Sequence, residues 1–250
     1  MAAPVSATET PAQPQTSGPT TTSSSFSPQQ VQDIQKIIHD YLVNNPEVLV
    51  EASKTLEAQT AQQEQSFAQK AIKENVSALF NDPASPMTGN AFSNVTLVEF
   101  FDYQCGHCKA MNTTVQNILK QNSNLRIIFK ELPIFGSESQ FAAKAALASV
   151  KQNKYLAFHD ALLSADNPLT NDKVFQIAQS VGLDTNALKK AMNSPEIQAQ
   201  LTSNFKLAQA LHLIGTPTFV MANKALTEFK FVPGATSEQN LQTLIDQLSK

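Results

Sequence analysis

The 250-residue chain is poor in cysteine, tryptophan and charge. Its only two cysteines, Cys105 and Cys108, lie within four residues of each other, so none is left for a disulfide between distant segments. Charged residues make up 16% of the chain, the net charge is −3, and lysines are scattered rather than clustered. This balance gives no electrostatic basis for binding nucleic acid or an anionic membrane surface, and we expect neither as a partner.

Long apolar runs are also absent. No stretch approaches the roughly 18 apolar residues of a membrane span, and the N-terminus lacks the basic and apolar blocks of a secretory signal. Residues 2–6 are small, as in a chain from which a signal has been cleaved, so we interpret residues 1–27 as a mature tail whose precursor signal is absent. This tail is rich in Thr, Ser, Pro, Gln and Ala, with Phe26 as its large apolar residue. We expect it to be a disordered, solvated tether.

Residues 28–80 have the periodicity of two helices. Apolar residues recur at helical spacing after Pro28, and again from Pro46 through Leu79 across a glutamine-rich middle. About 30 helical residues would span roughly 45 Å, which is more than one small domain covers. We therefore predict a helical dimerisation segment that forms a homodimer, since a two-fold interface needs only one self-complementary patch. The alternative is that these helices pack on their own catalytic domain.

A second domain is predicted to begin after a linker at residues 81–93, which is rich in Pro, Gly, Ser and Asn. The run Val95–Phe101 is almost entirely apolar, as in a strand covered on both faces, and only Glu99 interrupts it. The motif Cys105-Gly106-His107-Cys108 follows and leads into a segment with helical spacing. The pair of cysteines therefore lies where a strand turns into a helix.

This position favours redox chemistry. A helix N-terminus carries a partial positive charge and free amide groups that stabilise a thiolate, so Cys105 is the candidate nucleophile. His107, between the cysteines, adds an imidazole that can carry a second positive charge beside the thiolate. Cys108, one turn along the helix, can close a disulfide with Cys105 or resolve a mixed disulfide with a substrate.

The cysteines allow two other interpretations. They could be buried, inert thiols or half of a zinc site. A four-ligand zinc site would need His39, His159 or His212, each of which lies in a separate helical pattern. We favour the redox interpretation, with no metal and no cofactor, and assign no role to His159 or His212.

Residues 98–109, Val-Glu-Phe-Phe-Asp-Tyr-Gln-Cys-Gly-His-Cys-Lys, resemble the active-site strand and helix of the DsbA-like thiol-disulfide oxidoreductases. Residues 215–220 resemble the loop that carries a cis-proline opposite the cysteines of thioredoxin folds. The resemblance implies an α/β, thioredoxin-like catalytic domain at residues 94–250 with a helical insertion at about 138–213. It also implies that Pro217 is cis and that Thr216 and Pro217 bind substrate.

Glu99 is a candidate catalytic residue. A lone carboxylate in an apolar strand is costly unless it is protonated or paired, so we expect a raised pKa. In related proteins an acid at this point lies under the disulfide and assists proton transfer. The alternative is an acid at the strand edge that pairs with Lys130, and both are retained.

The direction of the reaction is suggested by resemblance. Gly106-His107 is similar to the dipeptide of protein disulfide isomerase, and Thr216 before the proline is similar to that of the dimeric DsbC-type isomerases. We therefore predict a periplasmic oxidase and isomerase that acts on unfolded or misfolded cysteine-containing secreted proteins. A DsbB-type oxidant and a DsbD-type reductant are the implied redox partners. A thioredoxin-type reductase, or a metal-binding or holdase surface protein, is the alternative.

Overall fold

The computed structural model describes residues 26–250, and most of the predicted tail lies outside this range. The chain divides into two compact units, residues 1–59 and 60–250. No helix within residues 26–250 is both long enough and apolar enough to cross a membrane.

The described part of the first unit consists of α1 (Pro28–Asn44) and the beginning of α2 (Glu47–Glu74). Ser27 and Gln30 form a capping box at the start of α1, in which each side chain bonds the backbone N–H of the other residue. No residue of α1 is buried, and a set of its large apolar side chains is exposed: Ile34, Ile37, Ile38, Tyr41 and Val43. A helix with an uncovered apolar face is typical of a segment that packs against another surface.

The second unit contains a five-stranded sheet in the order β1-β3-β2-β4-β5. Its strands are β1 (Met87–Gly89), β2 (Val95–Phe101), β3 (Leu125–Glu131), β4 (Thr218–Asn223) and β5 (Phe229–Pro233). Only β2 and β3 are parallel. The strand predicted at Val95–Phe101 is present as β2. Strand β1, however, lies inside the segment predicted to be a linker. This segment forms a strand because its backbone pairs with the edge of β3.

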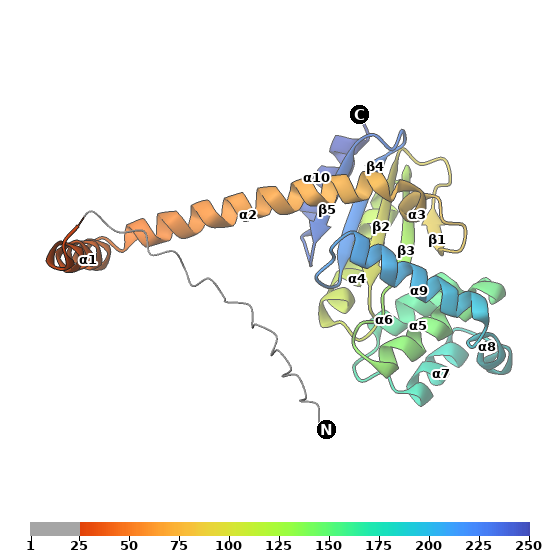
Figure 1. Cartoon of the computed structure of the whole chain (residues 1–250). Coiled ribbons are helices and arrows are strands. Elements are labelled where there is room, and N and C mark those ends of the chain that lie inside the picture. Colours follow the sequence, from red (N-terminus) through yellow and green to blue (C-terminus); the bar gives the residue numbers. More distant parts are fainter. Residues whose placement is uncertain (1–25) are drawn as a thin grey trace, which may run out of the picture. The chain divides into compact units, whose positions relative to one another are not determined.

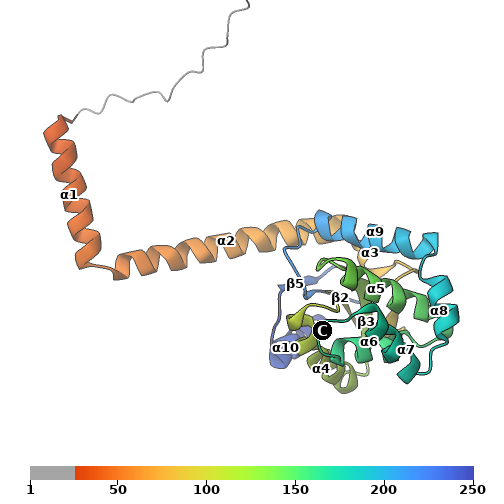
Figure 2. The ribbon, with the colours of Figure 1, turned by 90° about the horizontal axis from the view of Figure 1, so that it is seen from below.

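Helices cover both faces of the sheet and one of its ends (Figures 1 and 2). They are α3 (Val76–Phe80), α4 (Gly106–Gln121), α5 (Ser137–Ser149), α6 (Tyr155–Ser164), α7 (Asn171–Ser180), α8 (Thr185–Ala191), α9 (Pro195–Ala210) and α10 (Glu238–Leu248), with a short 3₁₀ turn at Val150–Gln152. Helices α5 to α9 occupy the predicted helical insertion. The fold is thioredoxin-like, as the resemblance implies.

Alternation along the strands divides the buried side chains into two cores. Val95, Leu97 and Phe101 face the core shared with α4, α10 and the insertion, whereas Val98 and Phe100 face the opposite side. The end of α2 contributes Ala68, Ala71 and Ile72 to that second core, together with α3. This part of residues 28–80 therefore packs on its own catalytic unit, which is the alternative left open above.

The long helix predicted to run to Leu79 ends earlier, at Glu74. The Asn75 side chain donates a hydrogen bond to the Ala71 carbonyl, and the chain then starts the separate helix α3. Asparagine competes with helical backbone bonds in this way, which explains the break.

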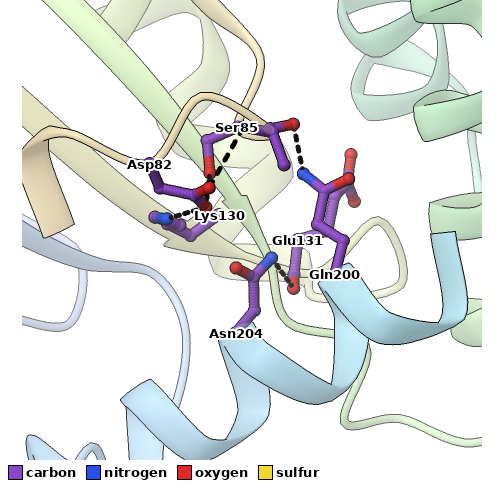
Figure 3. A network of polar contacts seen from close by, with 7 residues as sticks. Asp82, Ser85, Lys130, Glu131, Gln200 and Asn204 are labelled. Atoms are coloured by element: carbon purple, nitrogen blue, oxygen red, sulfur yellow. Dashed lines mark hydrogen bonds and ion pairs between the residues drawn. The ribbon is translucent and has the colours of Figure 1, made fainter. Parts of the chain in front are cut away.

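A polar network fastens residues 82–85 to the sheet (Figure 3). Lys130 is almost fully buried and pairs with Asp82 at 2.8 Å, and Ser85 donates a bond to the same carboxylate oxygen. Gln200 in α9 reaches the carbonyl of Ala84 in this segment. The segment between α3 and β1 is therefore held against β3 and α9.

Candidate active site

The first feature of the site is the turn between β2 and α4. Cys105 is the N-cap residue of α4, and its backbone N–H donates to the Asp102 carbonyl. Its side chain makes no capping bond and is 4% exposed. The sulfur of Cys105 thus lies at the N-terminus of a 16-residue helix, where the partial charge of the backbone favours an anion.

The second feature is the loop that precedes β4. The Thr216–Pro217 peptide bond is cis, as the resemblance implies. Because β4 pairs antiparallel with β2, this loop reaches the end of β2 that leads to the cysteines. The Cys105 Sγ donates to the Thr216 carbonyl oxygen at 3.3 Å. Two segments more than 100 residues apart in the sequence are therefore brought into contact at one sulfur atom.

The two cysteines have different environments. Both are free thiols, and Cys108 is fully buried. Burial raises the pKa of the Cys108 thiol, and the charges of Cys105 and Glu99 add to this effect. His107 lies on the exposed side of the first turn. Among residues 26–250 no group of three His, Cys, Asp or Glu side chains is placed to hold a metal ion.

Glu99 lies in the middle of β2, is 1% exposed, and neither of its carboxylate oxygens has a hydrogen-bond partner. Burial raises its pKa to about 8, and the nearby charge of Asp160 contributes. The alternative pairing with Lys130 is wrong. Glu99 is in register with Phe129, so Lys130, the next residue of β3, faces the opposite side of the sheet and pairs with Asp82.

The titration of Glu99 predicts how stability depends on pH. Its folded-state pKa of about 8 lies above the ordinary value of 4.5, so the folded protein holds a proton that the unfolded chain releases between these values. The contribution of Glu99 to stability is complete below about pH 4.5 and is lost as pH rises through 8. We expect Glu99→Gln to abolish this loss, as measured by urea unfolding at pH 5 and pH 8.5. An equal loss of stability in both proteins would contradict the assignment.

Asp102 organises the backbone around the cysteines, a role that the sequence analysis missed. Its buried carboxylate accepts bonds from the backbone N–H groups of Gln104, Ile134 and Phe135 and from the Ser139 hydroxyl, all between 2.7 and 3.1 Å. It therefore ties the motif turn to the segment that connects β3 with α5. The only signal for this role in the sequence is the position of Asp102, an acidic residue at the end of a strand and just before a turn.

Gln104 connects the same turn to the insertion. Its backbone carbonyl accepts a bond from the Asn167 side chain at 2.9 Å, and its own side-chain amide donates to Glu138. The Asn167–Pro168 peptide bond is also cis. The loop at Pro168 therefore lies beside the motif.

A buried polar cluster lies behind the turn. The hydroxyl groups of Tyr103 and Tyr155 both donate to one oxygen of Glu131, and His159 contacts the Tyr103 hydroxyl at 3.1 Å. Burial raises the pKa of Glu131 and lowers that of His159 to about 3. His159 is thus a neutral structural histidine, consistent with giving it no catalytic role. The cluster combines residues from α6, β3 and the turn before α4, and sequence spacing could not reveal it.

Three features described above define a class of protein. They are a pair of cysteines at the start of a helix, a cis-proline in the loop that contacts the first cysteine, and helices inserted into this sheet topology. Together they are the features of thioredoxin-like thiol-disulfide oxidoreductases. Residues 96–246 match the family described as DSBA-like thioredoxin domain. The chain belongs to this family. Residues 30–63 match a second family, described as the N-terminal domain of the copper resistance protein ScsC.

Individual relatives agree with this assignment. BcfH of Salmonella enterica Typhimurium is 31% identical, with a TM-score of 0.73 over 89% of this chain and 97% of that structure. A thioredoxin-like oxidoreductase from Silicibacter pomeroyi is 41% identical, with a TM-score of 0.64 over 68% of this chain and 95% of that one. The thiol:disulfide interchange protein DsbA of Bordetella pertussis is 25% identical, covering 57% of this chain and 70% of that protein.

Part of the chain also matches much longer proteins. The Na⁺/H⁺ antiporter NhaA 3 of Salinispora tropica is 26% identical over 127 residues. The match covers 50% of this chain but only 20% of the antiporter.

Proposed function

We propose that this protein is a periplasmic thiol-disulfide oxidoreductase that introduces and isomerises disulfide bonds in secreted proteins. The observation that carries the proposal is the placement of Cys105 at a helix N-terminus with its sulfur against the Thr216 carbonyl. Disulfide formation requires an oxidising compartment, which supports the periplasmic assignment. A DsbB-type oxidant and a DsbD-type reductant would then maintain the two redox states.

In oxidation, a substrate thiolate attacks Sγ of Cys105 in the Cys105–Cys108 disulfide. An S–S bond forms to the substrate, and Cys108 leaves as a thiolate. A second substrate thiolate attacks the substrate sulfur of this mixed disulfide, so the substrate disulfide forms and Cys105 leaves as a thiolate. Two electrons pass from the substrate to the enzyme. In isomerisation the Cys105 thiolate instead attacks a wrong disulfide, which forms a mixed disulfide and releases one substrate thiolate. A different substrate thiolate then attacks the substrate sulfur of the mixed disulfide, so a new substrate disulfide forms and Cys105 leaves as a thiolate.

Glu99 is proposed to handle the proton of Cys108. The buried Cys108 thiolate is unfavourable, as the raised pKa of this thiol shows, so the leaving sulfur needs a proton. A carboxyl with a pKa of about 8 is protonated at neutral pH and can supply it; the carboxylate takes the proton back when Cys108 attacks a mixed disulfide. Thr216 and Pro217 are proposed to hold the substrate backbone, and His107 to stabilise the thiolate of Cys105.

Self-association through residues 28–80 is proposed to provide the isomerase function, because two active sites could then hold one misfolded chain. The exposed apolar side chains of α1 support it. We expect Ile37→Asp with Ile38→Asp to give a monomer that oxidises a dithiol peptide normally but unscrambles a multi-disulfide protein about tenfold more slowly or worse. Sedimentation and refolding of scrambled substrate measure both properties.

A charge-matched control is available on the same helix. Gln32→Asp with Gln35→Asp adds the same charges at exposed polar positions and should preserve both assembly and isomerisation. Removal of residues 1–59 leaves the second unit complete and should reproduce the Ile37/Ile38 variant. If all forms are monomers with equal activity, the assembly proposal fails and a monomeric oxidase remains.

A further inference from the structure

A pocket of about 190 Å³ lies at the end of the sheet that is remote from the cysteines. It is lined by the loop between β1 and β2, by the first residues of β2 and β3, and by the turn between β4 and β5. Strand β2 is seven residues long, which corresponds to roughly 20 Å, and it leads from this pocket towards the motif. No residue of the motif or of the cis-proline loop lines the pocket, so it is separate from the exchange site.

Arg126, the only arginine in the chain, is the half-buried charge of this pocket. It lies directly opposite Thr96 in the register of β3 and β2. Its Nε and Nη2 atoms both donate to the Thr96 hydroxyl oxygen, at 3.2 and 3.1 Å, and Nη2 also donates to the Phe80 carbonyl oxygen. These acceptors fix the orientation of the guanidinium, but they are neutral and leave its charge uncompensated.

Two donor groups of the pocket have no partner among residues 26–250. They are Nη1 of Arg126 and the hydroxyl of Ser93, a residue that is only 7% exposed. Lys224, at the exposed edge, forms no ion pair with a described carboxylate, and no Asp or Glu lines the pocket. Polar groups of such low exposure are normally hydrogen-bonded, and a half-buried charge favours a counter-ion. The two donors and the two positive charges therefore predict an anionic ligand.

The rest of the wall determines the kind of anion. Phe92, whose side chain is 85% exposed, gives the pocket an apolar border together with Ala91 and Leu226. An apolar group attached to the anion would cover this ring and remove apolar surface from water. Guanidinium and hydroxyl donors bind carboxylate oxygens well, whereas inorganic phosphate has no apolar part and would leave the ring uncovered.

We propose that this pocket binds an organic carboxylate with a small aromatic or aliphatic body. The carboxylate accepts hydrogen bonds from Arg126 Nη1 and the Ser93 hydroxyl, Lys224 adds its charge, and the body covers Phe92. A small free acid and the C-terminus of a polypeptide that ends in an apolar residue carry the same chemistry, so the test includes both sources. The inference is independent of the proposed exchange function, because the pocket shares no residue with that site.

The first experiment is a calorimetric titration of the full-length protein with 3-phenylpropanoate, with its neutral amide and with inorganic phosphate. We expect the dissociation constant of the acid to be at least about tenfold lower than that of either other probe, because only the acid offers both charge and apolar surface. The second arm uses the peptide Ala-Ala-Phe with a free and with an amidated C-terminus. Tighter binding of the free peptide than of 3-phenylpropanoate identifies a polypeptide source, and the reverse order identifies a small acid.

Variants of the lining residues test the assignment of the donors. Arg126→Gln should weaken the binding of 3-phenylpropanoate at least about tenfold. Since Arg126 also makes bonds within the fold, Lys224→Gln and Ser93→Ala test the pocket independently, and each should weaken binding about threefold. Lys190→Gln, which removes an exposed lysine of α8 outside the pocket, is the matched control and should leave the affinity unchanged.

Several results would contradict the proposal. Equal affinity for the acid and for either its amide or phosphate would overturn it, as would unchanged affinity in both Lys224→Gln and Ser93→Ala. The absence of binding by both the acid and the free peptide at about 10 mM would have the same meaning. The disulfide exchange rate is measured separately and should be the same in all these variants, so failure of the proposed function and failure of this inference are distinguishable.

Discussion

Cys105→Ser is expected to lower the rate of disulfide exchange by at least about a thousandfold, because a serine hydroxyl is not ionised at neutral pH and cannot form the mixed disulfide. The only other cysteine is Cys108, and burial raises the pKa of its thiol, which makes it a poor replacement. The measurement is the rate at which a fluorescent dithiol peptide is oxidised by the protein with glutathione disulfide as the terminal oxidant. The fold should be unaffected, since Cys105 makes only one side-chain bond, to the Thr216 carbonyl.

Cys108→Ser serves as the matched control for this prediction. It also removes one sulfur from the motif but leaves the candidate nucleophile in place. We expect the Cys105 thiolate of this variant to attack glutathione disulfide, release one glutathione thiolate and accumulate a stable mixed disulfide with glutathione, visible as a mass increase that dithiothreitol reverses. If Cys105→Ser accumulates the adduct and Cys108→Ser does not, the order of attack proposed here is reversed.

Asp102→Ala is expected to destabilise the protein by about 3–5 kcal/mol, the largest loss of stability among the substitutions considered. Three backbone N–H groups and the Ser139 hydroxyl would lose their acceptor at a site that is 1% exposed. Each unsatisfied buried donor costs about 1–3 kcal/mol. Urea unfolding followed by circular dichroism measures the change, and the exchange rate should also fall because the motif turn loses its anchor.

Asp184→Ala provides the comparison. Asp184 also accepts two backbone N–H bonds, from Asn186 and Ala187, but at the exposed N-terminus of α8, where water can replace it. A cost of about 1 kcal/mol is expected there. The loss of stability in Asp102→Asn should lie between the losses in Asp102→Ala and Asp184→Ala. The amide of asparagine keeps one acceptor oxygen but turns an N–H group towards the backbone donors. Equal costs for the two alanine substitutions would show that burial of the Asp102 carboxylate is unimportant.

Local patterns predicted most elements of this protein. The apolar run at Val95–Phe101 became a strand buried along its whole length, and the segment with helical spacing after the motif became the helix Gly106–Gln121. These predictions succeeded because strand alternation, helical spacing and caps depend on residues near one another in the chain. The boundary at Asn75 and the edge strand Met87–Gly89 were missed. A three-residue strand has too little pattern of its own and exists only because β3 offers an unpaired edge.

The sequence alone determined the position of the proposed reacting pair, since Cys105 and Cys108 are the only thiols and lie where a strand meets a helix. It also indicated that a carboxylate at Glu99 would have a raised pKa. Only the tertiary structure decided which groups surround that pair. Adjacent residues of β3 face opposite sides of the sheet. Lys130 therefore points away from Glu99 and forms its ion pair with Asp82, which leaves Glu99 without a partner. The Asp102 carboxylate accepts hydrogen bonds from backbone N–H groups more than 30 residues away in the chain. These bonds form only when the chain folds, and no periodic pattern in the sequence indicates them.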